Sequence, residues 1–258
     1  MYLENKVFRV SYDSFNSENF GIKMGNVYLV DNSAELCPKD YSDSFSSIID
    51  ISKEAGFKHI TFKIDTSKKE VIKGVHSHSM ELADTLVRYL FDFSRSDLPT
   101  VNHKCSLGDC SLKDLQQLKD IARNSFKIDR FHSDDNLPNH LCDLYYDKWI
   151  ENSYNGLVDK VIVAYYNGEA VGFTTGKLKM SEEYSQLVLS AVSDKYRGIG
   201  VYTSMIHEGT KWLLNEMGSI TKGVIVGTQI DNIAVQKAWI KLGYTLFDSQ
   251  YVFQKYLD

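Results

Sequence analysis

The sequence contains little proline, little cysteine and no long apolar run, and each shortage excludes a class of protein. Only three of 258 residues are proline and 43% are hydrophobic, so the chain can bury a full core and is not a disordered segment. No stretch of about 18 apolar residues is present, so no membrane span is predicted. The four cysteines form no CxxC pair, and residues 1–20 are polar, unlike a signal peptide. We therefore expect reduced thiols and a cytoplasmic protein.

Positive charge is also outnumbered by negative charge. The net charge of −5 and the sequence pI near 5.8 argue against a nucleic-acid surface and leave a small molecule as the expected partner. His76 and His78 flank Ser77 without a cluster of carboxylates or cysteines beside them, so we expect no metal site. A homodimer is compatible with the sequence.

Strand-like and helix-like segments alternate along the chain, which predicts an α/β fold. In the first hundred residues the pattern predicts strands at 6–12, 26–30 and 59–64 and a helix at 41–56, whereas 82–93 could be either type. The proline in Asp97–Thr100 forces the preceding residue out of a helix. This predicts a domain boundary there, with a smaller N-terminal α/β domain at 1–100 and a second domain at 101–258.

The second domain has clearer local signals. Ser111 and Asp114 resemble a capping box before a helix that extends to Phe126, and a polar loop at 127–139 precedes a second helix. Asn167-Gly168 between two apolar runs predicts a β-hairpin. The remaining pattern predicts, in order, strand 184–193, helix 201–217, strand 223–229, helix 232–242 and strand 251–256.

The segment Lys195-Tyr196-Arg197-Gly198-Ile199-Gly200 links a predicted strand to a predicted helix. Glycines allow close approach of the backbone to a phosphate, and the unpaired N–H groups at a helix start point toward it. About thirty residues later the chain reads Asn232-Ile233-Ala234, followed by 238–244. The strand, the glycine turn and the helix start together predict an anion site, although a Gly-x-Gly turn by itself is also compatible with an ordinary strand-to-helix connection.

These two motifs and the order of elements from about residue 109 to the end resemble the GNAT superfamily of N-acetyltransferases. The resemblance implies a mixed, mostly antiparallel sheet that splays apart at an acetyl-CoA site. It also implies that backbone groups of the central strand pair with pantetheine and that the glycine turn holds the pyrophosphate. The cofactor-binding residues so implied are Ala191, Val192, Ser193, Lys195, Tyr196, Arg197, Gly198, Ile199, Gly200, Val201, Asn232 and Trp239.

One position departs from the family pattern. Many GNAT enzymes have a tyrosine seven residues after the asparagine, where it protonates the departing thiolate, but here the residue is Trp239. An indole N–H cannot supply a proton at neutral pH. Tyr244 or Tyr202 could substitute, although both could equally be core aromatics. Glu183, with Ser185 and Gln186, could hold a water that accepts the proton of the amine.

Other segments resemble the dTDP-fucosamine (dTDP-4-amino-4,6-dideoxygalactose) N-acetyltransferases. They are Asn19-Phe20-Gly21, Ser125-Phe126, 129–132 and 144–152. The resemblance implies acetyl transfer to the amine of a nucleotide-linked sugar, with Arg130, Phe131, His132, Tyr145 and Trp149 on the acceptor side. Tyr145 and Trp149 could instead form the buried stripe of a helix. The alternatives are a GNAT enzyme acting on another small or peptide amine, which the acidic charge favours, and an acetyl-CoA-binding module that has lost its acid.

Overall fold

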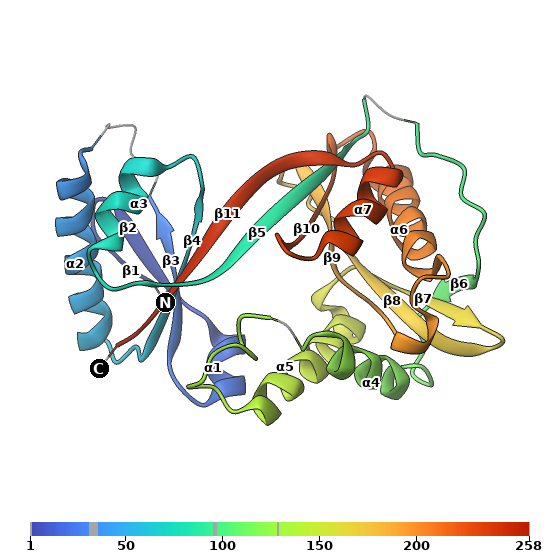
Figure 1. Cartoon of the computed structure of the whole chain (residues 1–258), viewed down its shortest axis with the longest axis horizontal. Coiled ribbons are helices and arrows are strands. Elements are labelled where there is room, and N and C mark those ends of the chain that lie inside the picture. The colour runs from blue at the N-terminus through green and yellow to red at the C-terminus, as the bar shows by residue number, and fades with distance from the viewer. Residues whose placement is uncertain (1, 31–35, 95–96, 128, 258) are drawn as a thin grey trace. The chain divides into compact units, whose positions relative to one another are not determined.

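The computed structural model describes residues 2–30, 36–94, 97–127 and 129–257, and the chain forms two compact units. Unit 1 comprises Met1–Leu86, Asp134–Leu137 and Asp248–Asp258, and unit 2 comprises Val87–Ser133 and Pro138–Phe247. Two long strands, β5 (Glu81–Asp92) and β11 (Thr245–Tyr256), each run from one unit into the other (Figure 1). No helix in the described ranges is both long and apolar enough to cross a membrane.

Unit 1 is a sheet with strand order β1-β2-β3-β4-β11, in which β3 and β4 are parallel and the other neighbours are antiparallel. Its elements are β1 (Tyr2–Glu4), β2 (Phe8–Tyr12), α1 (Ser14–Phe20), β3 (Met24–Leu29), α2 (Pro38–Glu54), β4 (His59–Asp65) and α3 (Lys69–His76).

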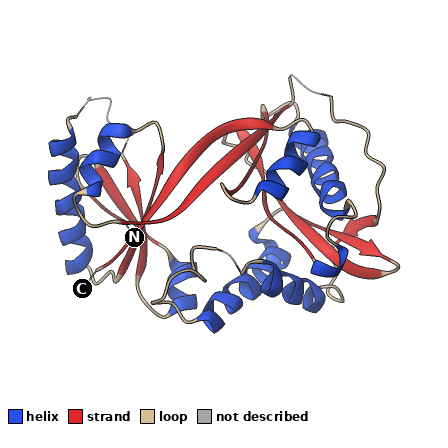
Figure 2. Cartoon of the chain, in the orientation of Figure 1, coloured by secondary structure: helices blue, strands red, loops and turns tan. Residues whose placement is uncertain are grey.

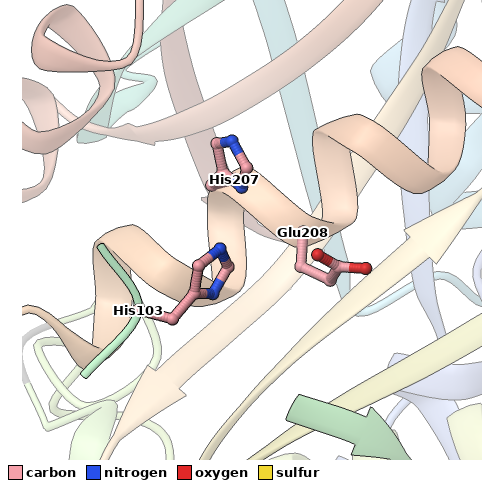
Figure 3. A group of neighbouring side chains, drawn as sticks. All are labelled: His103, His207 and Glu208. Carbon is pink, nitrogen blue, oxygen red and sulfur yellow. The ribbon is translucent and has the colours of Figure 1, made fainter. Parts of the chain in front are cut away.

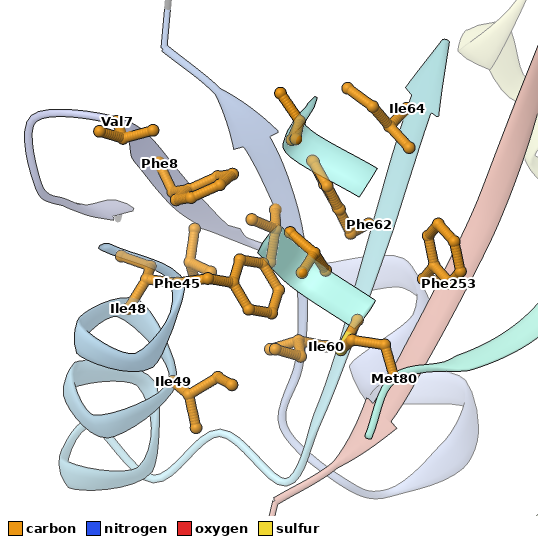
Figure 4. Close-up of a cluster of buried hydrophobic side chains, with 14 of the residues drawn as sticks. Val7, Phe8, Phe45, Ile48, Ile49, Ile60, Phe62, Ile64, Met80 and Phe253 are labelled. Carbon is orange, nitrogen blue, oxygen red and sulfur yellow. The ribbon is translucent and has the colours of Figure 1, made fainter. Parts of the chain in front are cut away.

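The core of unit 1 lies between its sheet and α2. Phe45 and Ile48 of α2 are fully buried, and the Phe45 ring meets Phe8 of β2 edge to face, with the ring centroids 5.0 Å apart (Figure 4). Phe62 of β4 completes this aromatic group at 5.7 Å from Phe8. Burying each such side chain contributes about 1.5–3 kcal/mol, so this contact holds the helix on the sheet.

Unit 2 has strand order β5-β10-β9-β8-β7-β6. Strands β6 to β9 are antiparallel neighbours, and β9 and β10 are parallel (Figure 2). Its elements are β6 (Ser106–Asp109), α4 (Leu115–Ser125), α5 (Asn139–Asn152), β7 (Lys160–Tyr166), β8 (Glu169–Lys177), β9 (Tyr184–Val192), α6 (Val201–Met217), β10 (Gly223–Gln229) and α7 (Ile233–Lys241).

The local sequence signals in unit 2 give the expected hairpin, but the capping box is only half formed, because the N-cap of α4 is Asp114 and Ser111 Oγ accepts no backbone N–H. The Asp114 carboxylate accepts hydrogen bonds from Ser111 N at 2.9 Å and Ser111 Oγ at 2.6 Å, directly before α4. Asn167 and Gly168 both have positive φ in the turn between β7 and β8. The mixed, mostly antiparallel α/β fold is confirmed, and all four cysteines are free.

The predicted boundary at Asp97–Thr100 does not match the division between the compact units, which falls between Leu86 and Val87 within β5. The final strand returns to unit 1 because β11 pairs with β4, from Gln250 opposite Asp65 to Tyr256 opposite His59. Such pairing joins segments almost two hundred residues apart, and a local pattern cannot indicate it.

Candidate active site

The parallel strands β9 and β10 are hydrogen-bonded to each other at one end only. Their register pairs Tyr184–Gln186 with Gly223–Ile225, yet β9 continues to Val192 and β10 to Gln229. On its other edge, β9 stays paired with β8 as far as Val192. The carboxyl half of β9 therefore has backbone groups facing β10 without a partner strand, as a ligand that adds to a strand edge requires.

The turn after β9 forms a cradle at the start of α6. Gly198 and Gly200 have φ of 80° and 95°, a conformation that favours glycine, and nothing lies within 4 Å of a Cβ built on Gly198. Gly200 is the N-cap of α6 and has no side chain to satisfy the first N–H groups, and the first turn contains no acidic residue. Open backbone N–H groups and the helix dipole together favour an anion at this turn.

Cationic side chains surround this turn. Arg197 is paired with Asp194 at 2.7 Å, and its Nε donates a long hydrogen bond of 3.4 Å to the carbonyl of Val192. The Lys195 ammonium lies 5.1 Å from the centroid of the Tyr196 ring. Both cations are therefore at the turn, as the sequence predicts.

A third cation here is one that sequence analysis missed. Lys104, an exposed residue before β6, has its Cγ 3.3 Å from the position that a Cβ on Gly200 would occupy. Nothing near Lys104 in the sequence indicates this contact, because the turn follows almost a hundred residues later.

The second predicted motif begins α7. Asn232 is the N-cap residue of that helix, and its Nδ2 donates to Thr228 Oγ1 at 3.0 Å. Thr228 belongs to the part of β10 that is not paired with β9. Asn232 thus holds the end of β10 against the start of α7.

Trp239, at the position where the resemblance implies an acid, lies in the core of unit 2. Its side chain is 3% exposed, and its ring is 5.6 Å from that of Tyr89. Nε1 is buried and makes no hydrogen bond of good geometry, but the indole N–H lies close enough to the Tyr202 hydroxyl to act against the rise in that hydroxyl's pKa.

The two alternative acids are poorly suited to that role. Tyr244 is 2% exposed and its hydroxyl lies 2.6 Å from Thr210 Oγ1, while Tyr202 is partly buried beside the same cluster. Burial raises the pKa of both hydroxyls above that of an ordinary tyrosine. Proton transfer to a thiolate, whose acid has a pKa near 8.5, becomes less favourable as the donor pKa rises.

Glu183 lies at the paired end of the two strands. It precedes β9, is exposed and forms an ion pair with Lys222, which precedes β10. Ser185, two residues further, is fully buried and its Oγ has no hydrogen-bond partner. Ser185 is therefore a predicted water-holding residue whose hydroxyl oxygen lacks a hydrogen-bond partner.

The residues predicted to bind the acceptor substrate differ in how exposed they are to a ligand. Phe131 is 6% exposed and packs against Tyr145 at 4.8 Å. The His132 ring is held between two carboxylates, with Nδ1 2.7 Å from Asp129 Oδ2 and Nε2 3.1 Å from Asp143 Oδ1. These contacts hold Phe131 and His132 in the segment between α4 and α5, and their place on the acceptor side stays a prediction.

Arg130 and Trp149 complete the predicted acceptor set. Arg130 is partly exposed, and its guanidinium carbon lies 4.3 Å from the centroid of the Phe131 ring. Trp149 packs against the core cluster that contains Ile150, as the alternative interpretation of a buried stripe expects. Arg130 is thus the predicted residue best able to meet an anionic ligand.

The chain matches the model of the acetyltransferase (GNAT) family over residues 115–244, which is half of its length. The chain belongs to the GNAT family. The matched region contains the split between β9 and β10, the glycine turn and Asn232. The protein is therefore an acetyltransferase of a family that uses acetyl-CoA.

A curated relative of this GNAT enzyme is the spore coat polysaccharide biosynthesis protein SpsD of Bacillus subtilis, 27% identical over 149 residues. The match covers 57% of this chain and 49% of SpsD, about half of that protein's length.

Solved structures share the fold over nearly the whole chain. A tandem GNAT protein from the clavulanic acid biosynthesis pathway has a TM-score of 0.64 at 13% identity, covering 98% of this chain and 79% of its own. A GCN5-related N-acetyltransferase from Sphaerobacter thermophilus has a TM-score of 0.69 at 10% identity, covering 97% and 77%.

The residues present fit acetyl-CoA. The cradle around Gly198 is open to a pyrophosphate, and the unpaired edge of β9 offers hydrogen bonds to pantetheine. When bound, acetyl-CoA supplies the activated acetyl group. Residues 191–193 and the turn at 195–201 would hold it.

Proposed function

We propose that this GNAT enzyme transfers acetyl from acetyl-CoA to the amine of a nucleotide-linked amino-deoxy sugar of the dTDP type, for cell-surface polysaccharide synthesis. The observation that carries the proposal is the match to SpsD, which is named as a polysaccharide biosynthesis protein. Arg130 adds support, because its partly exposed guanidinium beside an aromatic ring suits a diphosphate next to a sugar or base. Four free thiols fit a reducing, cytoplasmic compartment.

The chemistry requires a neutral amine and a stabilised oxyanion. The amine nitrogen attacks the thioester carbon, the C–N bond forms and the C–S bond breaks, and the amine proton passes to water. Ser185 is not the residue that holds this water, because it lies seven residues from Val192 along β9, roughly 23 Å in an extended strand. A backbone N–H of β9 near Val192 stabilises the oxyanion. The thiolate leaves without a tyrosine acid, because a thiol pKa near 8.5 makes it a tolerable leaving group.

A second candidate is acetylation of another small or peptide amine. The net charge of −5 favours it, because an acidic protein attracts a cationic acceptor more readily than a diphosphate.

A thiol-release assay separates the candidates. The enzyme and acetyl-CoA are incubated with dTDP-4-amino-4,6-dideoxygalactose, with a phosphate-free amino sugar and with a lysine-containing peptide. We expect the nucleotide sugar to give the highest kcat/KM. A higher kcat/KM for the phosphate-free sugar or the peptide would replace the proposal with the second candidate. No release with any amine, despite acetyl-CoA binding, would indicate a binding module.

A further inference from the structure

Three side chains of types that can bind a metal ion lie close together in unit 2, although no sequence motif links them. His103 lies in the segment between β5 and β6, and His207 and Glu208 lie on α6 (Figure 3). One ligand atom from each residue lies within 4.8 Å of those of the other two. The two imidazole rings are nearly perpendicular, with their centroids 5.2 Å apart.

His207 has a buried ring nitrogen that is available to an ion. Its side chain is only 8% exposed, and its Nδ1 is buried without a hydrogen-bond partner. A buried polar atom without a partner calls for an explanation, and a bound ion would satisfy it.

The donor set limits the kind of ion. Two imidazoles and one carboxylate suit Zn²⁺ and similar transition metals, whereas Mg²⁺ and Ca²⁺ prefer oxygen ligands. Bonds of 2.0–2.2 Å to one tetrahedral ion place the donors roughly 3.5 Å apart. The side chains of His103 and Glu208 are partly exposed, and binding requires them to move until their donors reach that spacing.

We propose that His103, His207 and Glu208 bind one zinc-class divalent ion, with water as the fourth ligand. The ion would tie the segment before β6 to α6. Lys104, the next residue in that segment, contacts the glycine turn at the start of the same helix. The proposal concerns metal binding only and does not depend on the identity of the acceptor.

Titration of the chelator-treated full-length protein with Co²⁺ tests this site. We expect one Co²⁺ per chain with visible absorption typical of four-coordinate cobalt, and Zn²⁺ should displace it. His103→Ala and Glu208→Gln should each weaken binding by at least about 10–100-fold, the loss seen when even an outer-shell partner is removed. Both residues are partly exposed, so the metal-free variants should unfold at the wild-type temperature.

His140→Ala is the matched control, because His140 is an exposed histidine of α5 outside the cluster. This variant should bind Co²⁺ as the wild type does. Wild-type-like binding by His103→Ala would overturn the proposal, as would loss of binding in His140→Ala. Failure of the wild-type protein to bind Co²⁺ or Zn²⁺ would overturn it as well.

Discussion

The hydroxyl of Tyr244 lies 2.6 Å from Thr210 Oγ1, inside the core of unit 2. Thr210 donates its own proton to the carbonyl of Ile206, also at 2.6 Å. Thr210 Oγ1 therefore accepts from Tyr244, and the phenol proton is directed into α6. This contact explains the place of Tyr244 as a core residue and predicts that Tyr244 does not protonate the departing thiolate.

Replacing either candidate acid should have a small effect on turnover. We expect Tyr244→Phe and Tyr202→Phe each to reduce kcat by less than about tenfold, against the roughly 10²-fold or greater loss of an essential proton donor. Tyr244→Phe should also lose about 0.5–1.5 kcal/mol of stability with its buried hydrogen bond. Steady-state kinetics and urea unfolding measure both effects. A larger fall in kcat with an unchanged KM for acetyl-CoA would identify that tyrosine as the acid.

Gly198→Val should abolish acetyl-CoA binding and leave the fold intact. The β-branched side chain fills the cradle and strains a residue with φ of 80°. We expect Kd to rise by roughly 100-fold or more as charge-assisted hydrogen bonds to the pyrophosphate are lost, and Gly200→Val should behave alike. Isothermal titration calorimetry measures the change.

Gly168→Val is the control for this substitution. Gly168 has φ of 82° and, like Gly198, nothing within 4 Å of a built Cβ, but it lies in the β7–β8 hairpin. Gly168→Val should lower the free energy of unfolding by about 1–2 kcal/mol, as Gly198→Val does, but it should retain acetyl-CoA binding. Equal loss of binding in the two variants would mean that strain, and not a blocked cradle, is responsible.

Two arginines should affect different substrates. Arg130→Ala should raise the acceptor KM on the order of 10–100-fold, since a charge-assisted contact contributes roughly 1.5–3 kcal/mol, and leave the KM for acetyl-CoA unchanged. Arg197→Ala, at the glycine turn, should do the reverse with a smaller effect, because Asp194 already balances its charge. Steady-state kinetics in both substrates tests the pair. Equal weakening of both substrates by Arg130→Ala would indicate a structural arginine.

Asp114 should stabilise unit 2 in a pH-dependent way. Burial acts to raise the pKa of this carboxyl, but hydrogen bonds from Ser111 and Tyr165 outweigh it and lower the pKa below its usual range. A lowered folded-state pKa gives stability that is present above the unfolded value near 3.9 and is lost as the pH falls through the folded value.

Asp114→Asn should therefore cost about 1–3 kcal/mol at pH 7, and the difference from wild type should shrink below about pH 4. Urea unfolding at pH 7, 5 and 3 measures it. Asp109→Asn is the control, because Asp109 is an exposed carboxylate paired with Lys160 and should change little. A cost for Asp114→Asn that stays constant with pH would contradict the assignment.

Features fixed by neighbouring residues could be predicted from the sequence. Helix 201–217 and strand 223–229 have their predicted bounds, because hydrophobic period and the glycine stop determine them locally. The positive φ of Gly198 and Gly200 follows from the same short motif. The position and backbone conformation of the glycine turn were thus predictable, and its binding of a phosphate stays a prediction.

Features that depend on distant pairing could not be predicted. Segment 81–92 is compatible with either helix or strand until its place in the sheet is known, and it is a strand, β5. Short elements such as α1 and β6 also lack a distinctive period and were not expected. The burial of His132 and the approach of His103 to His207 depend on side chains that meet only in the folded chain.

Hydrogen–deuterium exchange with and without acetyl-CoA tests most directly whether the ligand binds in the split. Those backbone amides of β9 between Leu187 and Val192 that face β10, and the amides of the turn at 198–201, should be protected when acetyl-CoA is bound, whereas amides already bonded, such as that of Leu189, should change little. The paired ends, 184–186 and 223–225, should change little, because their hydrogen bonds already exist. Protection of β9 and the turn would support the account. Saturating acetyl-CoA that leaves both segments unprotected would contradict it.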